Sequence, residues 1–171
     1  ESLLDELKND GYRFVSVPKN AGGYIGKYKF INDFMKKQHY DVVHSHVALF
    51  SGLVLMAAKK NGVGVRIAHS HIIKWNRQEN IKYKAYKKLM QYLLNKYATE
   101  KIGCSSAAGQ YLFGKNAYNK QGTILANGVE IDKYIYNDEY RSEIRKELSI
   151  SPDTLLVGHV GTIYKIKNPP G

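Results

Sequence analysis

The stretch YDVVHSHVALFSGLVLMAAKK, residues 40–60, decides the fold. It opens with a short apolar run that ends in the tripeptide His-Ser-His (44–46), and apolar residues at helical spacing follow at once. Gly62 closes that helix, and the next apolar run, VGVRIAHSH (63–71), ends in the same tripeptide at 69–71. Short apolar runs on either side of a buried helix predict two parallel strands joined by a crossover, because strands of a parallel sheet are covered on both faces.

The same alternation extends in both directions along the chain. Strand patterns are found at residues 12–17, 40–46, 63–71, 101–105, 122–128 and 154–161, and helix patterns at 2–9, 27–37, 50–60, 77–97, 105–114 and 138–148. Six strands with intervening helices predict an α/β fold with a doubly wound, mainly parallel sheet.

Composition is that of a globular protein. Of 171 residues, 43% are hydrophobic and 24% are charged, which excludes a disordered chain. The single cysteine, Cys104, cannot form an intrachain disulfide and suits a reducing compartment. The longest nearly apolar stretch, residues 47–58, is shorter than the roughly 20 residues that span a bilayer. The net charge of +11 predicts attraction to anions such as phosphorylated molecules, acidic lipid or nucleic acid.

A polar segment divides the chain. Residues 137–153 are rich in charge, and a new strand pattern starts directly after them. We therefore expect one α/β domain at 1–136, a connector helix and linker at 137–153, and the first strand and loop of a second domain at 154–171. Since the chain begins without Met, we expect it to be an excerpt of a longer polypeptide.

The two histidine tripeptides have three interpretations. Ligands of parallel α/β sheets bind beyond the carboxyl ends of the strands, so His46 and His71 are candidates for a ligand cleft if their strands are neighbours. A structural interpretation makes His44 and His69 inward residues that are hydrogen-bonded to the backbone. A metal centre is the third interpretation, but such sites usually add a carboxylate, a cysteine or a third histidine, so no metal is expected.

The helix pattern at 77–97 is strongly basic, with lysines at positions 82, 84, 87, 88 and 96. Its apolar residues Ile81, Ala85, Leu89, Tyr92 and Leu93 follow helical spacing. A core helix with a solvated basic face, a membrane-surface helix and a nucleic-acid contact are all compatible with this pattern. No recognisable nucleic-acid motif accompanies it, so no nucleic-acid partner is expected.

The order of motifs resembles the family 4 glycosyltransferases of the GT-B fold, and among them bacterial enzymes of capsular or exopolysaccharide synthesis. The motifs are DVVHSH, RIAHSH, GCSSAAGQYLFG, ILANGVEIDKY and VGHVGTIYKIKN. The resemblance implies a Rossmann-like acceptor-side domain, whose first strand or two are expected upstream of Glu1, followed by the start of a donor-side domain.

The resemblance also implies site residues. His71 matches the histidine that reaches the donor sugar, and His46 stands at a cleft position. Asn127 and Gly128 match the turn before the interdomain crossover. Gly161 and Lys167 match the first loop of the donor domain, where Thr162 replaces the usual arginine; threonine lacks the two-pronged grip of arginine on phosphate.

The implied activity is retaining transfer of a hexose from a nucleotide-sugar, such as a UDP- or GDP-sugar, to a lipid-linked glycan acceptor. No cofactor and no metal are implied, and the expected location is the cytoplasm, with peripheral contact at the inner face of the membrane. The excerpt alone is expected to be inactive. The alternative is a non-catalytic basic α/β domain that binds a membrane surface or nucleic acid.

Overall fold

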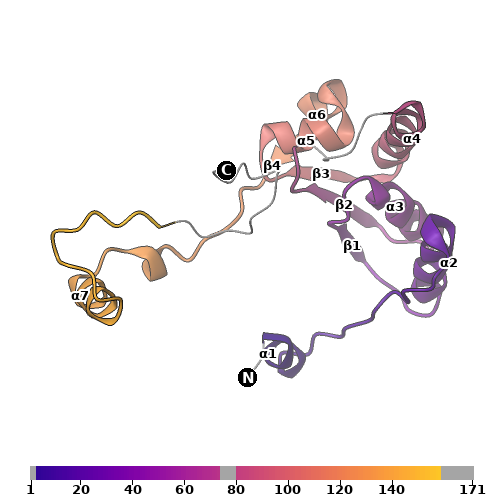
Figure 1. The fold of residues 1–171 in the computed structure, drawn as a ribbon. Coiled ribbons are helices and arrows are strands. Elements are labelled where there is room, and N and C mark those ends of the chain that lie inside the picture. Colours follow the sequence, from indigo (N-terminus) through magenta and orange to yellow (C-terminus); the bar gives the residue numbers. More distant parts are fainter. Residues whose placement is uncertain (1–2, 74–79, 159–171) are drawn as a thin grey trace. The chain divides into compact units, whose positions relative to one another are not determined.

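The structure is a computed structural model that describes residues 3–73 and 80–158. Its sheet consists of β1 (Val42–Ser45), β2 (Val65–Ser70), β3 (Glu100–Gly103) and β4 (Gly122–Ile124). The strands are all parallel and lie in chain order across the sheet (Figure 1). The predicted α/β class with a parallel, Rossmann-like sheet is confirmed.

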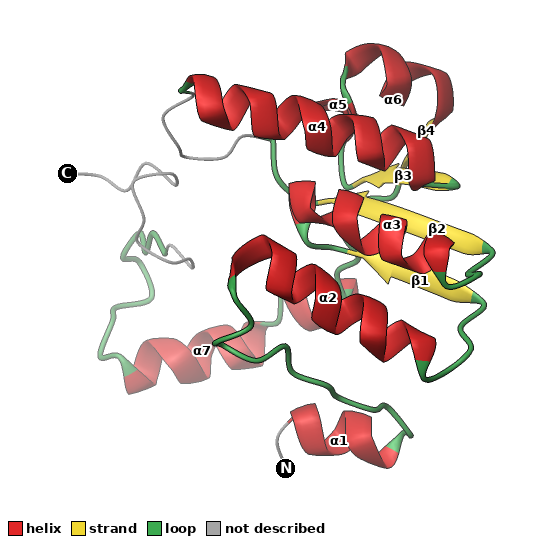
Figure 2. Ribbon diagram, turned by 90° about the vertical axis from the view of Figure 1, so that its right-hand side faces the viewer, coloured by secondary structure: helices red, strands yellow, loops and turns green. Residues whose placement is uncertain are grey.

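Successive strands are connected by helices α3 (Ser51–Lys60), α4 (Ile81–Tyr97), and the pair α5 (Ser106–Phe113) and α6 (Lys115–Gln121). Helix α2 (Gly23–Lys36) precedes β1 and packs against α3. Figure 2 shows α2, α3 and α4 side by side in front of the strands. The preceding helix α1 spans Leu3–Asn9, and a short 3-10 helix, η1, spans Ala48–Phe50.

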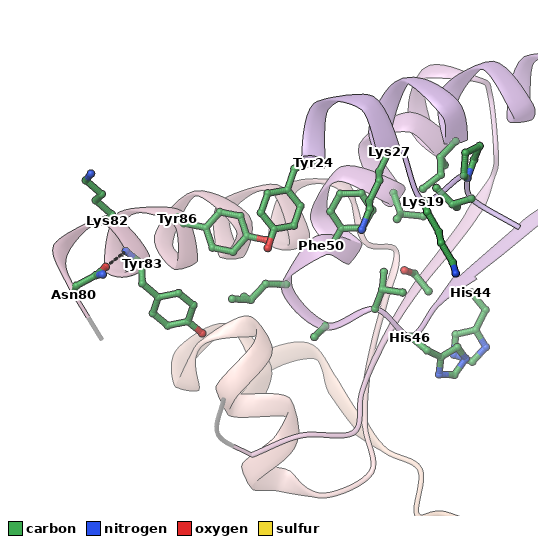
Figure 3. A pocket seen from close by; sticks show the side chains of 18 residues that line it. Lys19, Tyr24, Lys27, His44, His46, Phe50, Asn80, Lys82, Tyr83 and Tyr86 are labelled. Atoms are coloured by element: carbon green, nitrogen blue, oxygen red, sulfur yellow. Dashed lines mark hydrogen bonds between the residues drawn. The ribbon is translucent and has the colours of Figure 1, made fainter. Parts of the chain in front are cut away.

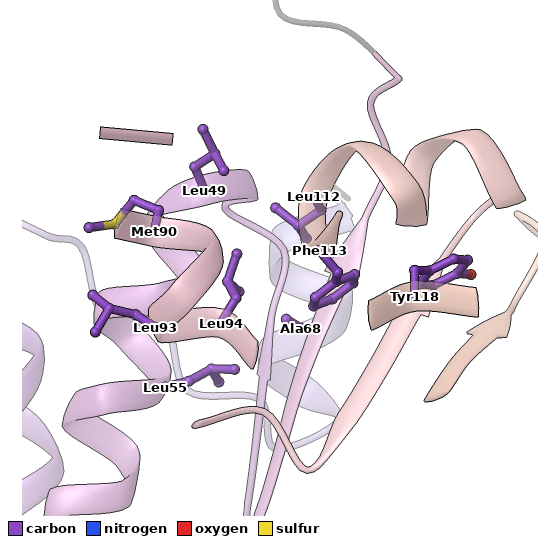
Figure 4. Close-up of a cluster of buried hydrophobic side chains, with 9 residues drawn as sticks. All are labelled: Leu49, Leu55, Ala68, Met90, Leu93, Leu94, Leu112, Phe113 and Tyr118. Atoms are coloured by element: carbon purple, nitrogen blue, oxygen red, sulfur yellow. The ribbon is translucent and has the colours of Figure 1, made fainter. Parts of the chain in front are cut away.

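The main core lies between the sheet and helices α3, α4 and α5 (Figure 4). Ala68 of β2 is fully buried there against Leu55, Leu94 and Leu112. Alternate strand residues point to opposite faces, so Val43 and Ala68 face these helices whereas His44 and His69 face the other way. The histidines therefore lie on the face of the sheet opposite to α3, α4 and α5.

Glycines bring α5 and α6 close to the end of β3. A Cβ atom on Gly103 would lie 2.7 Å from the backbone nitrogen of Gly109 in α5, and one on Gly109 would overlap the ring of Tyr118. The Tyr118 hydroxyl donates to the carbonyl of Thr123 at 2.8 Å. Since only glycine leaves room for this ring, these positions hold the helices against the sheet.

The chain divides into two compact units, Glu1–Ala126 and Asn127–Gly171. The described part of the second unit contains η2 (Ile131–Tyr134) and α7 (Asp138–Glu147), and none of its helical residues is buried. Asn137 caps α7 by accepting from the backbone nitrogen of Tyr140 at 2.9 Å. The predicted helix 138–148 is thus confirmed as an exposed element.

Two predicted strands are wrong where the structure describes them. Residues 12–17 are exposed and have no regular secondary structure, because no described strand lies beside them to form a hydrogen-bonded ladder. Residues 155–158 are also not a strand, and the remainder of the prediction at 154–161 lies outside the described residues. The sheet that the structure describes therefore has four strands instead of six.

Helix α4 presents a different face to the core from the one predicted. Met90, Leu93 and Leu94 are buried, whereas Ile81, Leu89 and Tyr92 are 86%, 54% and 58% exposed. Only Leu93 of the predicted apolar stripe is buried. Within the described ranges, no helix combines the length and the apolar character needed to cross a membrane.

Candidate functional site

The two histidine tripeptides meet at one edge of the sheet. Strands β1 and β2 are parallel neighbours, with Val42 opposite Val65 and Ser45 opposite Ala68. The register places His46, directly after β1, beside His69 of β2, and their ring centroids lie 5.1 Å apart. The repeated tripeptide in the sequence therefore becomes a single cluster of imidazoles at the carboxyl ends of two strands.

A hydrogen bond joins the rings of His46 and His71 directly. Nδ1 of His46 lies 2.8 Å from Nε2 of His71, and both side chains are exposed. Their rings are stacked, with centroids 5.1 Å apart and planes inclined by 22°. The predicted placement of these two residues at the same edge of a parallel sheet is confirmed, whereas their roles toward a substrate stay predictions.

His69 is buried, as its predicted structural role requires, whereas His44 is not. His44 is exposed, whereas His69 is only 5% exposed. No hydrogen bond of good geometry joins a ring nitrogen of His69 to a described residue, although the backbone of Leu125 lies close enough to raise its pKa. His44 stacks on His69 with centroids 5.4 Å apart and nearly parallel planes.

Desolvation and mutual repulsion favour the neutral form of three of these rings. Partial desolvation by neighbouring atoms lowers the pKa of His44, and repulsion from His71 lowers it further. The pKa of His46 is lowered by partial desolvation and then by His44 and His71. The pKa of His69 is lowered in the same way by burial and by the other three histidines; the nearby backbone of Leu125 opposes part of the shift. Desolvation penalises the charged imidazolium, so this environment favours the neutral form of these rings.

The backbone turns sharply just after His46. Ala48 has φ 49°, a left-handed conformation that costs a residue with a Cβ atom about 1 kcal/mol or more. Ser45 and Ser51 lie on either side of this turn, and their buried hydroxyls are hydrogen-bonded at 2.9 Å. This bond fixes the start of α3 to the end of β1 and holds the turn beside the histidines.

A cavity of about 1510 Å³ opens at the end of β1 (Figure 3). His44 and His46 line it, together with three aromatic residues from different elements: Tyr24, Phe50 and Tyr86. The ring of Tyr24 stacks on Phe50 at 5.6 Å and on Tyr86 at 5.3 Å between centroids. These three aromatic residues belong to α2, η1 and α4, so all three elements line the cavity.

The charged residues that line the cavity are Lys19, Lys27 and Lys82, and no acidic side chain is among the lining residues that the structure describes. The cavity therefore favours anionic ligands. None of these lysines was singled out from the sequence as a site residue. The segment 17–27 and the start of α4 lie far apart in the chain, and only the fold brings them to one cavity.

The remaining predicted site residues belong to other parts of the chain. Asn127 and Gly128 lie in the second compact unit, where both are exposed. Gly161, Lys167 and the substituted position Thr162 lie outside the described residues. The structure therefore brings together His46 and His71 of the predicted set, and adds His44 and His69 to them.

Two curated bacterial proteins are similar to this chain in sequence. One is "Putative glycosyltransferase EpsF" of Bacillus subtilis (strain 168), 29% identical over 169 residues that make up 96% of this chain and 44% of EpsF. The other is capsular polysaccharide biosynthesis glycosyltransferase CapH of Staphylococcus aureus, 29% identical over 144 residues, or 82% of this chain and 39% of CapH. The chain thus spans less than half the length of either relative, and no protein-family model matches it.

Solved structures of Anabaena Alr3699/HepE share the fold. The complex of that protein with UDP matches 72% of this chain and 32% of its own, with a TM-score of 0.58. Its complex with UDP-glucose matches 87% and 40%, with a TM-score of 0.60. Sequence identity is 15% in both comparisons, so the likeness concerns the fold. It agrees with the parallel, helix-flanked sheet described above.

Proposed function

We propose that this chain is the acceptor-side part of a family 4 glycosyltransferase of the GT-B fold. The whole enzyme transfers a hexose from a UDP- or GDP-sugar to a glycan acceptor in capsular or exopolysaccharide synthesis, with retention of configuration and without a metal. The observation that carries this proposal is the pair His46 and His71, hydrogen-bonded at the carboxyl edge of a parallel sheet beside an open cavity.

The position of the pair agrees with the way α/β sheets bind ligands. Loops beyond the carboxyl ends of parallel strands form the crevice in which substrates bind. The two relatives are named as glycosyltransferases, and the solved structures with the same fold hold UDP and UDP-glucose. These likenesses support a nucleotide-sugar as the donor. In our proposal His71 lies toward the donor sugar and His46 lies beside it.

Asn127, Gly128, Gly161 and Lys167 complete the proposed substrate contacts. Lys167 would hold the diphosphate leaving group, whose negative charge grows in the transition state. Thr162 cannot supply the second cation at that loop. We therefore expect weaker donor binding than in an enzyme with arginine at this position.

The cavity at the end of β1 suits the acceptor. Aromatic side chains such as Tyr24 and Phe50 offer flat apolar surfaces to the faces of sugar rings, and Lys19, Lys27 and Lys82 offer positive charge. Ammonium groups bind phosphate as point charges. A glycan linked to a lipid through phosphate combines both features, and we propose this acceptor class together with peripheral attachment at the inner face of the cell membrane.

The proposal is tested by replacing His71 in the full-length protein. We expect His71→Ala to lower the rate of sugar transfer by at least about tenfold, which corresponds to about 1.4 kcal/mol of transition-state stabilisation. Transfer is measured with radiolabelled UDP- and GDP-sugars and a lipid-linked acceptor. His39→Ala is the matched control, because His39 is exposed and pairs with Asp41 away from the cluster. Unchanged turnover in His71→Ala would remove His71 from the site.

The donor panel also separates the enzyme from the alternative of a non-catalytic basic binding domain. An enzyme should select one nucleotide-sugar and transfer its sugar. A binding domain should show no transfer with any donor. Its affinity for anions should change with the salt concentration and not with the identity of the nucleotide-sugar. The second outcome would overturn the proposed function.

A further inference from the structure

The cluster at the ends of β1 and β2 contains four imidazoles within contact of one another. Ring centroids lie 4.1 Å apart for His44 and His46, and 4.2 Å apart for His69 and His71. Ligand atoms of His44, His46 and His69, one from each ring, all lie within 4.8 Å of one another. No other set of three histidine, cysteine or acidic residues in the described ranges 3–73 and 80–158 has this geometry.

The buried imidazole of His69 lacks a hydrogen-bond partner. The residue is only 5% exposed, and neither of its ring nitrogens is hydrogen-bonded within the described part of the chain. A buried polar group without a partner costs about 1–3 kcal/mol. A ligand that bonds to one nitrogen of His69 would remove that cost. Because the unpartnered side chain belongs to the cluster, it points to an ion among the histidines.

The chemistry of the cluster selects the ion. Imidazole nitrogen suits zinc, copper and nickel, whereas calcium and magnesium require oxygen ligands. No carboxylate belongs to the group that the described residues form. Zinc binds imidazole nitrogen at about 2.0–2.1 Å, so three nitrogens that lie within 4.8 Å of one another must move closer together by side-chain rotation to share one ion. Neutral rings are the form that binds metal.

We propose that His44, His46 and His69 form a binding site for a divalent transition-metal ion of the zinc class, with a fourth position open to water or a ligand. His71 supports the site from outside the coordination sphere. Nε2 of His71 is hydrogen-bonded to Nδ1 of His46. The other ring nitrogen of His46, its Nε2, is therefore the one that binds the ion. Metal-bound histidines usually have such a partner on the other ring nitrogen, because it fixes the tautomer and the ring orientation.

This site goes beyond the proposed glycosyl transfer, which needs no metal, although the two share His46 and its partner His71. Each tripeptide in the sequence contains two histidines, and no third ligand stands near it along the chain. The parallel register of β1 and β2 supplies the third, because it places His69 beside His46. The objection raised by the sequence, that a third ligand is missing, is therefore answered by the fold.

The experiment uses the purified chain after removal of metals with a chelator. Titration with ZnCl₂, followed by calorimetry and by elemental analysis after desalting, should give about one zinc per chain, as expected for a site with three protein ligands. Substitution by Co²⁺ should give the visible absorption of a low-symmetry, four-coordinate ion with nitrogen ligands. No retained zinc, or a Co²⁺ spectrum of the octahedral aquo ion, would overturn the proposal.

Variants identify the ligands. His44→Gln and His69→Gln should each weaken zinc binding at least about tenfold, and His71→Gln should weaken it less while changing the Co²⁺ spectrum. His44 is exposed, so His44→Gln tests the site even if His69→Gln fails to fold. His39→Gln, at an exposed histidine paired with Asp41, should bind zinc like the unmodified chain. Equal losses in His39→Gln and His44→Gln would show general surface binding and overturn the assignment.

Discussion

His69 is the buried member of the histidine cluster because of its strand. β2 has β1 on one side and β3 on the other, whereas β1 lies at the edge of the described sheet. The equivalent residue of β1, His44, is therefore exposed. Two identical tripeptides in the sequence thus acquire different environments, and only the strand order distinguishes them.

This difference predicts a pH dependence of stability. Burial holds the pKa of His69 below its ordinary value of 6.5, so the unfolded chain takes up this proton more readily than the folded chain. The free energy of unfolding should therefore fall as the pH drops through about 6.5, and level off once the folded ring is protonated as well. Urea unfolding at pH 7.5 and pH 5.5, in the presence of a chelator, should show a lower midpoint at the acidic pH.

A glutamine at position 69 cannot be protonated in this range. His69→Gln should therefore reduce the difference between the two midpoints, whereas His39→Gln should retain it in full. If His69→Gln and the unmodified chain lose the same stability between the two pH values, the buried ring is not the cause.

At the scale of elements, the contact between α5 and α6 depends on one absent side chain. Alanine at position 109 would favour the helix by about 1 kcal/mol, but its methyl group would overlap the Tyr118 ring. We expect Gly109→Ala to destabilise the chain by about 1–3 kcal/mol, measured as a lower urea midpoint. Gly64→Ala is the control, since its nearest neighbour, the carbonyl of Asp41, would lie at 3.9 Å. Equal midpoints for the two variants would contradict the close packing of α5 and α6.

The sequence predicted elements best where a pattern coincided with a tertiary partner. The runs that became β1 and β2 are apolar and have neighbours, and the predicted helix after β3 has a cap, since the Ser105 hydroxyl accepts from the nitrogen of Ala108 at 3.2 Å. The run at 12–17 has the residue types of a strand but no described neighbour, and strand preference depends on such context. Helix α6, KNAYNKQ, was missed because it has no apolar periodicity and only Gly114 separates it from α5.

At the scale of the molecule, the excess of positive charge gathers on α4 next to exposed apolar residues. Lys84, Lys88 and Lys96 share the exposed side of this helix with Leu89 and Tyr92. A helix surface of this kind binds anionic membranes through both charge and apolar contact. We expect the chain to sediment with phosphatidylglycerol vesicles at low salt and to detach as NaCl screens the charges.

Replacing Lys84, Lys88 and Lys96 with glutamate should abolish most of this binding, since each lysine near the surface contributes about 1 kcal/mol. The same change at Lys37, Lys59 and Lys60, which are also exposed, gives a variant of identical net charge. This second variant should retain most of the binding. Equal losses in both would show that total charge, not α4, attracts the vesicle.

The sequence allowed the fold class to be predicted, but only half of the histidine cluster. Alternating strand and helix patterns were enough for a parallel α/β sheet. His46 and His71 could be placed at one edge because parallel strands end at the same side. The partners of His69 and the lysines around the cavity depended on strand register and on how three helices meet, which local patterns do not encode.

The bond between His46 and His71 has a consequence for the two strand ends. Nδ1 of His46 and Nε2 of His71 share one hydrogen, so when both rings are neutral they must hold the same tautomer: either both carry their hydrogen on Nδ1 or both carry it on Nε2. Whatever fixes the hydrogen on one ring therefore dictates its position on the other. A molecule that hydrogen-bonds only to His71 would therefore change which ring nitrogen of His46, a lining residue of the cavity, carries its hydrogen. The loops that follow β1 and β2 would then change together.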